Sequence, residues 1–437
     1  MKTLDSIPTS KLERASKLVK TGVKIGGNYL KYYGESLVGS EEAKDRLNEN
    51  NASDIYDGLK TLKGSALKVA QMLSMERNIL PRAYVERFSL SQFSVPPLSG
   101  PLVKKTFKRY MNALPEDIFN SFDYNAINAA SIGQVHKVTK DGRNLAVKIQ
   151  YPGVAESISS DLALVKPIAL RMFNMGARES EKYFKEIEEK LKEETDYLHE
   201  LEMSVSITSK ASHIPNLRFP NYYSEYSSQR ILTMDWMEGV PLGAFVNGEF
   251  DANIAQALGQ SLWDFYMFQI HGLKAVHADP HPGNFLVNRQ GELIVIDFGC
   301  IKEIPDQFYT PYFELANASA MKDQDLFLSK LYELEMLVAS DGAEEITYFT
   351  KLFREMLQLF TAPFNKDRFD FANPEFWDGI GKMAEFFSQD QTIRKMNANR
   401  GSKHFLYMNR TFFGLYNLLY DLKADVDTKA YLKYLSN

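Results

Sequence analysis

The sequence predicts an α+β fold in which a strand-rich segment lies between helix-rich segments. Apolar and polar residues alternate in residues 129–138 and 145–151, which indicates two strands joined by the turn sequence KDGRN. Apolar residues recur at helical spacing in residues 53–75, and most of the chain after residue 297 shows the same pattern. We therefore expect a helical extension, a strand-containing first lobe and a helical second lobe, over residues 1–110, 111–236 and 237–437.

Composition narrows the class of protein. The 437 residues are 44% hydrophobic and carry a net charge of −5, which is typical of a globular protein and does not predict a nucleic-acid partner. Cys300 is the single cysteine, so a disulfide framework is excluded and a reducing compartment fits. No run of 18 apolar residues occurs, so we expect no transmembrane helix. The expected location is the cytoplasm, with peripheral attachment to the inner membrane.

The N-terminal segment is basic, with seven Lys or Arg against two Asp or Glu in residues 1–34. An apolar stripe at helical spacing begins at Leu12 and reaches Leu30 through Val19 and Val23. Two interpretations remain open at this point. The helix either docks on the rest of the protein, or it rests on anionic lipid as a basic amphipathic helix.

Four further elements are expected from the same patterns. The helix over residues 53–75 has Ser53 as its expected N-cap. An acidic helix is expected over residues 177–206, a strand over 230–236 and a helix over 252–271.

Residues 277–299 read HADPHPGNFLVNRQGELIVIDFG and place one carboxylate at each end of a short hairpin. Asn284 follows Asp279 by five positions, and Asp297 begins the tripeptide DFG thirteen positions later. Protein kinases space H-R-D-x-x-x-x-N and D-F-G in this order. Mg²⁺ bridges the phosphate oxygens of ATP and takes carboxylate and amide oxygens as ligands. We therefore expect Asp297 and Asn284 to hold Mg²⁺, and Asp279 to orient or deprotonate an acceptor.

The segment before this motif follows the frame of the kinase nucleotide loop, G-x-G-x-x-G-x-V. Here the frame reads Asn128-x-Ala130-x-x-Gly133-x-Val135, so two of the three glycines are replaced and the loop is expected to be stiffer. Lys148 ends the strand motif LAVK and would be an isolated buried charge without a partner. We expect a phosphate and a helix carboxylate as its partners.

That carboxylate is expected from the acidic segment at 177–206, where spacing alone does not choose among Glu186, Glu188, Glu189, Glu193, Glu194, Asp196 and Glu200. After Asp297 the sequence lacks A-P-E and a Ser/Thr/Tyr-rich activation segment, which argues against an ordinary protein kinase. The expected architecture is a protein-kinase-like two-lobed fold with a helical N-terminal extension.

Taken together, these motifs resemble the UbiB family of atypical kinase-like proteins with an aarF domain, over residues 55–435. AASIGQVH (129–136) resembles the family's Ala-rich nucleotide loop, and HADPHPGNF with DFG resembles its catalytic and metal loops. LKVAQMLS (67–74) resembles its K-x-G-Q motif, and KEETDYLHE (192–200) resembles its E-x-D helix. The resemblance implies ATP and Mg²⁺ as cofactors, with catalytic roles for Asp279, Lys148 and Glu200. It implies nucleotide contacts from Ala129, Ala130, Ser131, Gly133, Val135, Lys148, Asp235 and Met237.

The resemblance also implies a lid, because the family's N-terminal extension folds over the active site. Its residues here would be Lys68 and Gln71 on the extension and Glu194 and Asp196 of E-x-D. Two positions depart from the family pattern, Ala70 for the glycine of K-x-G-Q and Asn128 for the first alanine of the loop.

The implied function is an ATPase that supports isoprenoid quinone (ubiquinone) biosynthesis or lipid homeostasis at a membrane. Its implied partners are ATP, lipid or isoprenoid-quinone intermediates, the membrane surface and proteins of the lipid pathway. Two alternatives remain. One is a small-molecule phosphotransferase of the aminoglycoside or choline kinase type, and the other is a non-catalytic pseudokinase scaffold.

Overall fold

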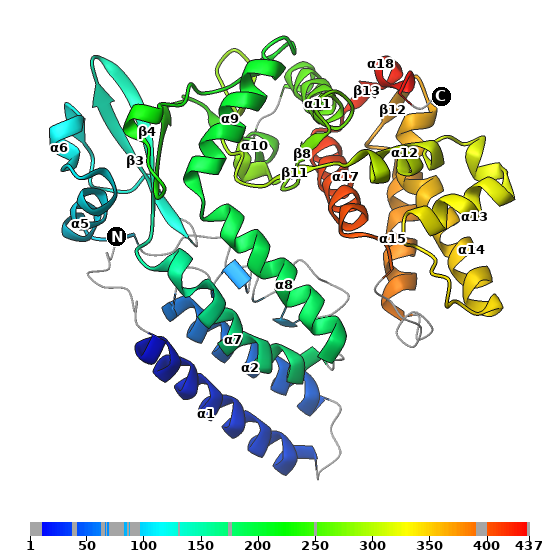
Figure 1. Cartoon of the computed structure of the whole chain (residues 1–437), viewed down its shortest axis with the longest axis horizontal. Coiled ribbons are helices and arrows are strands. Elements are labelled where there is room, and N and C mark those ends of the chain that lie inside the picture. The colour runs from blue at the N-terminus through cyan, green and yellow to red at the C-terminus, as the bar shows by residue number, and fades with distance from the viewer. Residues whose placement is uncertain are drawn as a thin grey trace. The chain divides into compact units, whose positions relative to one another are not determined.

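The computed structural model divides the chain into two compact units. Unit 1 comprises residues 1–202 and 221–236, and unit 2 comprises residues 203–220 and 237–437. The structure describes residues 11–36, 42–62, 66, 68–69, 83–84, 87, 97–129, 132–173, 177–248, 251–389 and 400–434. Helices and strands occur in both units (Figure 1), so the expected α+β class is confirmed.

Unit 1 contains an antiparallel sheet that carries Lys148 and part of the predicted nucleotide loop. Strands β1, β3, β4 and β6 follow one another across the sheet, and β2 pairs with β3. Asp141 and Gly142 both have positive φ and form the two-residue turn between β3 and β4, as the KDGRN sequence predicts. The strand bounds are Ser121–Phe122 (β1), Asn128–Ala129 (β2), Gly133–Lys140 (β3), Arg143–Gln150 (β4) and Ile231–Asp235 (β6).

Two groups of helices complete unit 1. One group packs on the sheet through Leu98, Val103 and Phe107, and consists of α5 (Gly100–Met111) and α6 (Pro115–Ile118). In the other group α1 contacts α2 and α7, and α7 contacts α8 (Figure 1). Its members are α1 (Lys11–Ser36), α2 (Glu42–Leu62), α7 (Val154–Phe173) and α8 (Ala177–Glu194).

Two helix predictions are wrong in their bounds. The helix expected from residue 53 begins at Glu42, and Ser53 lies inside it because buried Ala43 and Leu47 extend the apolar face toward the N-terminus. The single acidic helix expected over residues 177–206 is two helices, α8 and α9 (Tyr197–Ala211). The break falls at residues 195–196 and changes which acidic side chains share a face. Most of residues 63–75 lie outside the described residues.

Unit 2 places a small sheet, in the order β5-β10-β9-β7, beside the catalytic motif. The hairpin β9–β10 separates the two motif carboxylates as predicted, and β8 pairs with β11 on either side of it. The strands are β5 (Leu217–Arg218), β7 (Val240–Pro241), β8 (Ala275–His277), β9 (Phe285–Val287), β10 (Leu293–Val295), β11 (Ile301–Glu303), β12 (Arg368–Asp370) and β13 (Asp425–Asp427).

The rest of unit 2 is mainly helical, as expected. Helix α11 continues into a π-helical turn, Phe268–Leu273, that leads to β8. The helices are α10 (Leu242–Val246), α11 (Ala252–Met267), α12 (Asp306–Leu315), α13 (Gln324–Glu333), α14 (Ala343–Phe360), α15 (Pro374–Gln389), α17 (Lys403–Asp421) and α18 (Lys429–Leu432).

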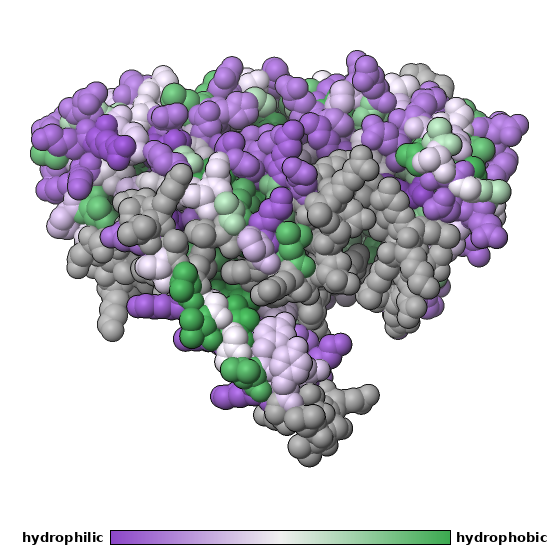
Figure 2. Space-filling view, turned by 60° about the horizontal axis from the view of Figure 1, so that its bottom comes forward, coloured by the Kyte–Doolittle hydropathy of each residue, from purple (hydrophilic) through white to green (hydrophobic). Residues whose placement is uncertain are grey.

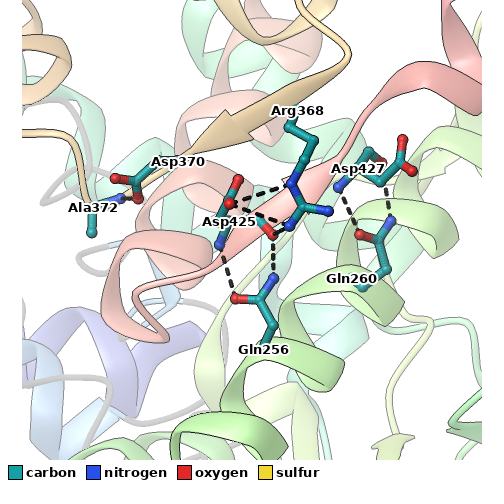
Figure 3. Close-up of polar contacts among 7 residues, drawn as sticks. All are labelled: Gln256, Gln260, Arg368, Asp370, Ala372, Asp425 and Asp427. Carbon is teal, nitrogen blue, oxygen red and sulfur yellow. Dashed lines mark hydrogen bonds and ion pairs between the residues drawn. The ribbon is translucent and has the colours of Figure 1, made fainter.

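Two glutamines of α11 hold the C-terminal strand β13 (Figure 3). Gln256 accepts from the backbone N–H of Asp425 at 3.0 Å and donates to its carbonyl, and Gln260 makes the same pair of bonds with Asp427 at 2.8 and 3.1 Å. One helical turn matches two residues of a strand in length, so residues i and i+4 of α11 reach alternate residues of β13. Arg368 also donates to the Asp425 carbonyl, at 2.8 Å. These bonds fix the C-terminal strand to the helix that precedes the catalytic motif.

Candidate functional site

Lys148 and Glu200 form an ion pair inside unit 1. The Lys148 ammonium lies 2.8 and 3.0 Å from the two carboxylate oxygens of Glu200, on strand β4 and helix α9. The Lys148 side chain is 19% exposed and that of Glu200 is 4% exposed. The ammonium also lies 5.0 Å from the centre of the Tyr197 ring, one helical turn before Glu200. The lysine charge is therefore held by a buried carboxylate and an aromatic face.

The break between α8 and α9 sets the position of Glu200. The Thr195 carbonyl accepts from the Gln150 side-chain amide at 3.1 Å and from the Arg230 guanidinium. Asp196 caps α9, since its carboxylate accepts from the backbone N–H of His199 at 3.2 Å. Sequence reasoning did not identify Gln150 or Arg230. The alternation along β4 offered a signal, because Gln150 lies two positions after Lys148 on the same strand.

Glu194, the last residue of α8, contacts the N-terminal extension. Lys68 lies 2.9 Å from the Glu194 carboxylate, and both side chains are largely buried. Glu194 is thus the acid of E-x-D that the structure places against Lys68, while Asp196 caps α9. Gln71, the other predicted lid residue, lies outside the described residues.

The nucleotide-loop residues lie at the edge of the same sheet. Val135 is the cross-strand partner of Lys148, and Ala129 is buried in β2. A Cβ added at Gly133 would lie 2.8 Å from the Ile149 carbonyl oxygen and 2.9 Å from the Tyr197 hydroxyl, so this glycine permits close packing of strand and helix. The predicted loop residues Ala130 and Ser131 lie outside the part of the chain that the structure describes.

Asp235 and Met237 follow strand β6. The Asp235 carboxylate accepts from the Tyr223 hydroxyl at 2.6 Å and from the backbone and side-chain nitrogens of Asn221 at 3.0 and 2.6 Å. These three bonds, with the backbone N–H of Asp235 that donates to the Asn221 carbonyl at 2.9 Å, hold the residue against its own sheet. Met237 is the first residue of unit 2 after the strand.

The segment of unit 2 that the sequence predicts to be catalytic, residues 277–299, is a tightly bonded loop and hairpin. The Asn284 side-chain amide donates to the Asp279 carbonyl at 3.0 Å, and the Asn284 carbonyl accepts from Ile296 N–H at 3.1 Å. The Asp297 carboxylate accepts from Gly299 N–H at 2.9 Å. Asp279, Asn284 and Asp297 are each half-buried. The structure therefore joins the loop that carries Asn284 to the strand that ends before Asp297.

The donor set of this loop fits Mg²⁺. The amide nitrogen of Asn284 is turned toward the Asp279 carbonyl, which directs its oxygen to the opposite side as a ligand. One carboxylate and one amide oxygen, completed by phosphate oxygens and water, are the hard ligands that Mg²⁺ takes in nucleotide sites. Asp297 and Asn284 would hold the ion, with Lys148 and Glu200 belonging to the other unit.

Further residues support the catalytic loop and were not predicted. The Tyr266 hydroxyl lies 3.3 Å from Nδ1 of His277, and both residues are buried. Burial and, to a smaller extent, the Asp279 carboxylate hold the pKa of Tyr266 well above its ordinary value. A Cβ added at Gly414 of α17 would lie 2.3 Å from Cγ of Pro280, so α17 packs directly against the loop beside Asp279. Contacts of this kind join distant parts of the sequence and leave no local pattern.

Comparison with known proteins gives the same family as the sequence motifs. The model of the ABC1 atypical kinase-like domain matches residues 90–330. "Atypical kinase COQ8B, mitochondrial" of Rattus norvegicus is 30% identical over 350 residues, which cover 76% of this chain and 64% of the relative. "Protein ACTIVITY OF BC1 COMPLEX KINASE 8, chloroplastic" of Arabidopsis thaliana is 28% identical over 330 residues, which cover 73% of this chain and 43% of the relative. The match thus spans between 43% and 64% of the length of these relatives.

A solved structure also resembles this chain. The Rv3197–erythromycin complex from Mycobacterium tuberculosis has a TM-score of 0.61 and 26% identity, covering 91% of this chain and 98% of that chain. The family match covers more than half of the chain, and the solved structure shares its kinase-like fold. The chain belongs to the ABC1 atypical kinase-like family, which is the aarF or UbiB family that its motifs resemble.

Proposed function

We propose that this protein binds Mg²⁺-ATP and hydrolyses it slowly, as an atypical kinase-like ATPase. The observation that carries the proposal is the Lys148–Glu200 ion pair, because a lysine held in this way presents a fixed positive charge to phosphate. Lys148 would contact the phosphates, and Asp297 with Asn284 would hold Mg²⁺, which neutralises phosphate charge when bound. Asp279 would orient the water that attacks.

Water is the proposed acceptor because the extension contacts the E-x-D segment. The Lys68–Glu194 bond joins the extension to the residue that precedes the break before α9. In the proposal this extension occupies the region where a protein hydroxyl would enter. Asp279 then serves water, and turnover is slow.

The proposed setting is a membrane that carries isoprenoid lipids. Membership of the ABC1 family supports a role in quinone biosynthesis or lipid homeostasis, and a relative named COQ8B supports it further. Within the described ranges, no helix combines the length and apolar character that crossing a bilayer needs. The proposed partners are ATP, an isoprenoid-quinone or lipid intermediate and proteins of the same pathway.

Release of phosphate from Mg²⁺-ATP tests the proposal, measured with and without vesicles that contain anionic lipid. We expect slow turnover that needs Mg²⁺, rises with anionic vesicles and disappears in Asp279→Asn. Turnover only after addition of a small hydroxylated acceptor would instead indicate a small-molecule phosphotransferase. Nucleotide binding without turnover under any condition would indicate a pseudokinase scaffold.

A second candidate function is the binding of a bulky small molecule. The similar solved structure is a complex with erythromycin. Unit 2 has an open cavity of about 660 Å³ whose lining combines apolar and charged side chains, among them Met203, Ile207, Leu273, Ile304, Lys210, Lys274, Glu303 and Asp306. We expect erythromycin to raise the unfolding temperature of the wild type, and Met203→Trp, which would narrow the cavity with a larger ring, to reduce that rise. An unchanged unfolding temperature in the wild type would eliminate this function.

A further inference from the structure

Helix α1 is fixed to unit 1 by a polar face. The Arg14 guanidinium forms two bonds with the Asp161 carboxylate of α7, at 2.6 and 2.5 Å, and a third with the Leu62 carbonyl at 3.1 Å. Both charged side chains are buried. Asn28 donates to Asn51 and Asp54 of α2 at 3.0 and 2.9 Å. These directional bonds fix the rotation of α1 about its own axis.

The apolar stripe of α1 faces away from this contact. Val19, Val23 and Leu30 are 66%, 72% and 76% exposed. Tyr29 and Tyr33 are also exposed, and their rings lie 6.5 Å apart. Figure 2 shows hydrophobic side chains gathered in a strip along this helix. We call these five residues the outward stripe.

A strip of lysines runs beside the outward stripe. Lys20, Lys24 and Lys31 each follow a stripe residue by one position and are exposed. One position on an α-helix is a rotation of about 100°, so the lysines form a parallel strip next to the apolar one. The helix carries six basic residues against two acidic ones, whereas the whole chain has a net charge of −5. Positive charge is therefore concentrated on this helix.

We propose that the outward stripe and its lysine strip form a docking surface for an anionic lipid bilayer. An exposed apolar stripe with tyrosines and a neighbouring row of lysines fits the boundary between acyl chains and anionic headgroups. The stripe would enter the headgroup region and the lysines would contact lipid phosphates, with α1 lying in the plane of the surface. The inference deepens the proposed function by identifying the surface that meets the membrane.

A second copy of the chain is the alternative partner for the outward stripe. Gly22 and Gly26 lie four positions apart, and a Cβ at either would contact none of the residues that the structure describes, so another helix has room to approach. Pairing of two α1 helices would bring two lysine strips together, which like-charge repulsion opposes. Anionic lipid instead neutralises the same strip. The charge pattern therefore favours the bilayer.

A fluorescent label at the stripe tests the proposal in the full chain. The one native cysteine, Cys300, is buried, so a polarity-sensitive dye would react with an introduced cysteine. We expect the dye at Val23→Cys to shift its emission to the blue with vesicles containing phosphatidylglycerol, but not with phosphatidylcholine alone. The same dye at Val338→Cys, an exposed valine of unit 2, should not respond. No shift at Val23→Cys would overturn the proposal. A shift that appears without vesicles and grows with protein concentration would also overturn it, in favour of a second copy.

Co-sedimentation with the same vesicles measures how much the lysines contribute to vesicle affinity. Each basic residue near an anionic surface contributes about a fivefold factor to binding, so Lys20→Gln/Lys31→Gln should weaken it about 25-fold. Lys24 is left in place because it already pairs with Asp54 of α2 at 3.3 Å. Lys351→Gln/Lys382→Gln, which changes exposed lysines of unit 2, should bind like the wild type. Equal loss in both variants would overturn the proposal, because it would mean that total charge rather than α1 is responsible.

Vesicle binding by the outward stripe and Mg²⁺-ATP binding by the nucleotide site can be tested independently. Val19→Ser/Val23→Ser/Leu30→Ser should lose at least tenfold in vesicle binding while its circular dichroism and its Mg²⁺-ATP binding stay unchanged. Vesicle binding equal to that of the wild type would overturn the lipid surface alone. Vesicle binding by a wild type that does not bind Mg²⁺-ATP would overturn the proposed function and leave the lipid surface standing.

Discussion

Replacing Glu200 by Gln tests whether the Lys148 ion pair is as deeply buried as the structure indicates. The substitution keeps the shape of the side chain and removes only its charge. Lys148, which is 19% exposed, would then keep its ammonium without a carboxylate at 2.8 Å. Removing one partner of a buried pair costs about 3 to 5 kcal/mol. The partial exposure of Lys148 and the Tyr197 ring beside it place the expected cost near the lower end, about 3 kcal/mol.

Denaturant unfolding of a double-mutant cycle provides the assay. Lys148→Met removes the charge that Glu200→Gln leaves uncompensated, so the double variant should be more stable than Glu200→Gln alone. Mg²⁺-ATP binding should weaken in each single variant and be little worse in the double, because the two residues act as a unit.

A surface pair on α8 is the matched control. Glu188 and Lys192 lie 2.9 Å apart, with the Lys192 side chain 59% and the Glu188 side chain 30% exposed, and a glutamine at position 188 can still accept from the Ser159 hydroxyl. Glu188→Gln should therefore cost less than about 1 kcal/mol. If Glu200→Gln costs no more than Glu188→Gln, or if the cycle is additive in both stability and nucleotide binding, the buried pair is refuted.

Three further predictions concern the extension, a buried carboxyl and the catalytic loop. Lys68→Ala should gain autophosphorylation and lose lipid-stimulated ATPase activity, measured with radiolabelled ATP, because the bond that holds the extension is removed. Burial raises the pKa of Asp264 to about 6. The folded state then binds this proton more tightly than the unfolded one, so stability falls as pH rises from about 4 to 6, and Asp264→Asn should gain about 2 kcal/mol at pH 7 in urea unfolding. Gly414→Ala should lower ATP turnover at least tenfold, because the new methyl group would displace Pro280.

Each of these predictions has its own control. Lys68→Ala/Asp297→Asn is the blank for labelling, and equal labelling of Lys68→Ala and wild type would contradict the extension model. The stabilisation by Asp264→Asn should vanish below about pH 4, and a gain that is independent of pH would contradict the burial argument. Gly381→Ala, at a helical glycine whose added Cβ would contact none of the described residues, should leave turnover unchanged. Equal losses in the two glycine variants would show that loop displacement is not the cause.

The comparison of α1 with its sequence shows what periodicity can predict. The helix was predicted because its apolar residues recur at helical spacing. Which face is buried could not be read from that pattern, since the buried face carries Arg14, Thr21 and Asn28. Their burial depends on Asp161 and Asn51, which lie in other helices and are invisible to local periodicity.

The acidic segment gives the corresponding lesson for the site. The pattern predicted one continuous helix. The helix is instead interrupted where the Thr195 carbonyl accepts hydrogen bonds from Gln150 and Arg230. Spacing alone therefore left the partner of Lys148 open, and the family resemblance chose Glu200, which the structure places against it. In contrast, the hairpin between Asp279 and Asp297 was predicted locally, because its turn and strands are contiguous in sequence.

The most direct test of the central claim is Mg²⁺-dependent nucleotide binding by Asp297→Asn. The substitution keeps the bond from Gly299 N–H available while it removes the negative charge at the end of β10. Asp378→Asn, at an exposed position of α15, is the matched control. Thermal unfolding with increasing ATP and Mg²⁺ should give a clear upward shift for wild type and Asp378→Asn, and an affinity lower by about 100-fold or more for Asp297→Asn. A wild-type shift in Asp297→Asn would contradict the claim that this carboxylate holds the metal of an ATP site.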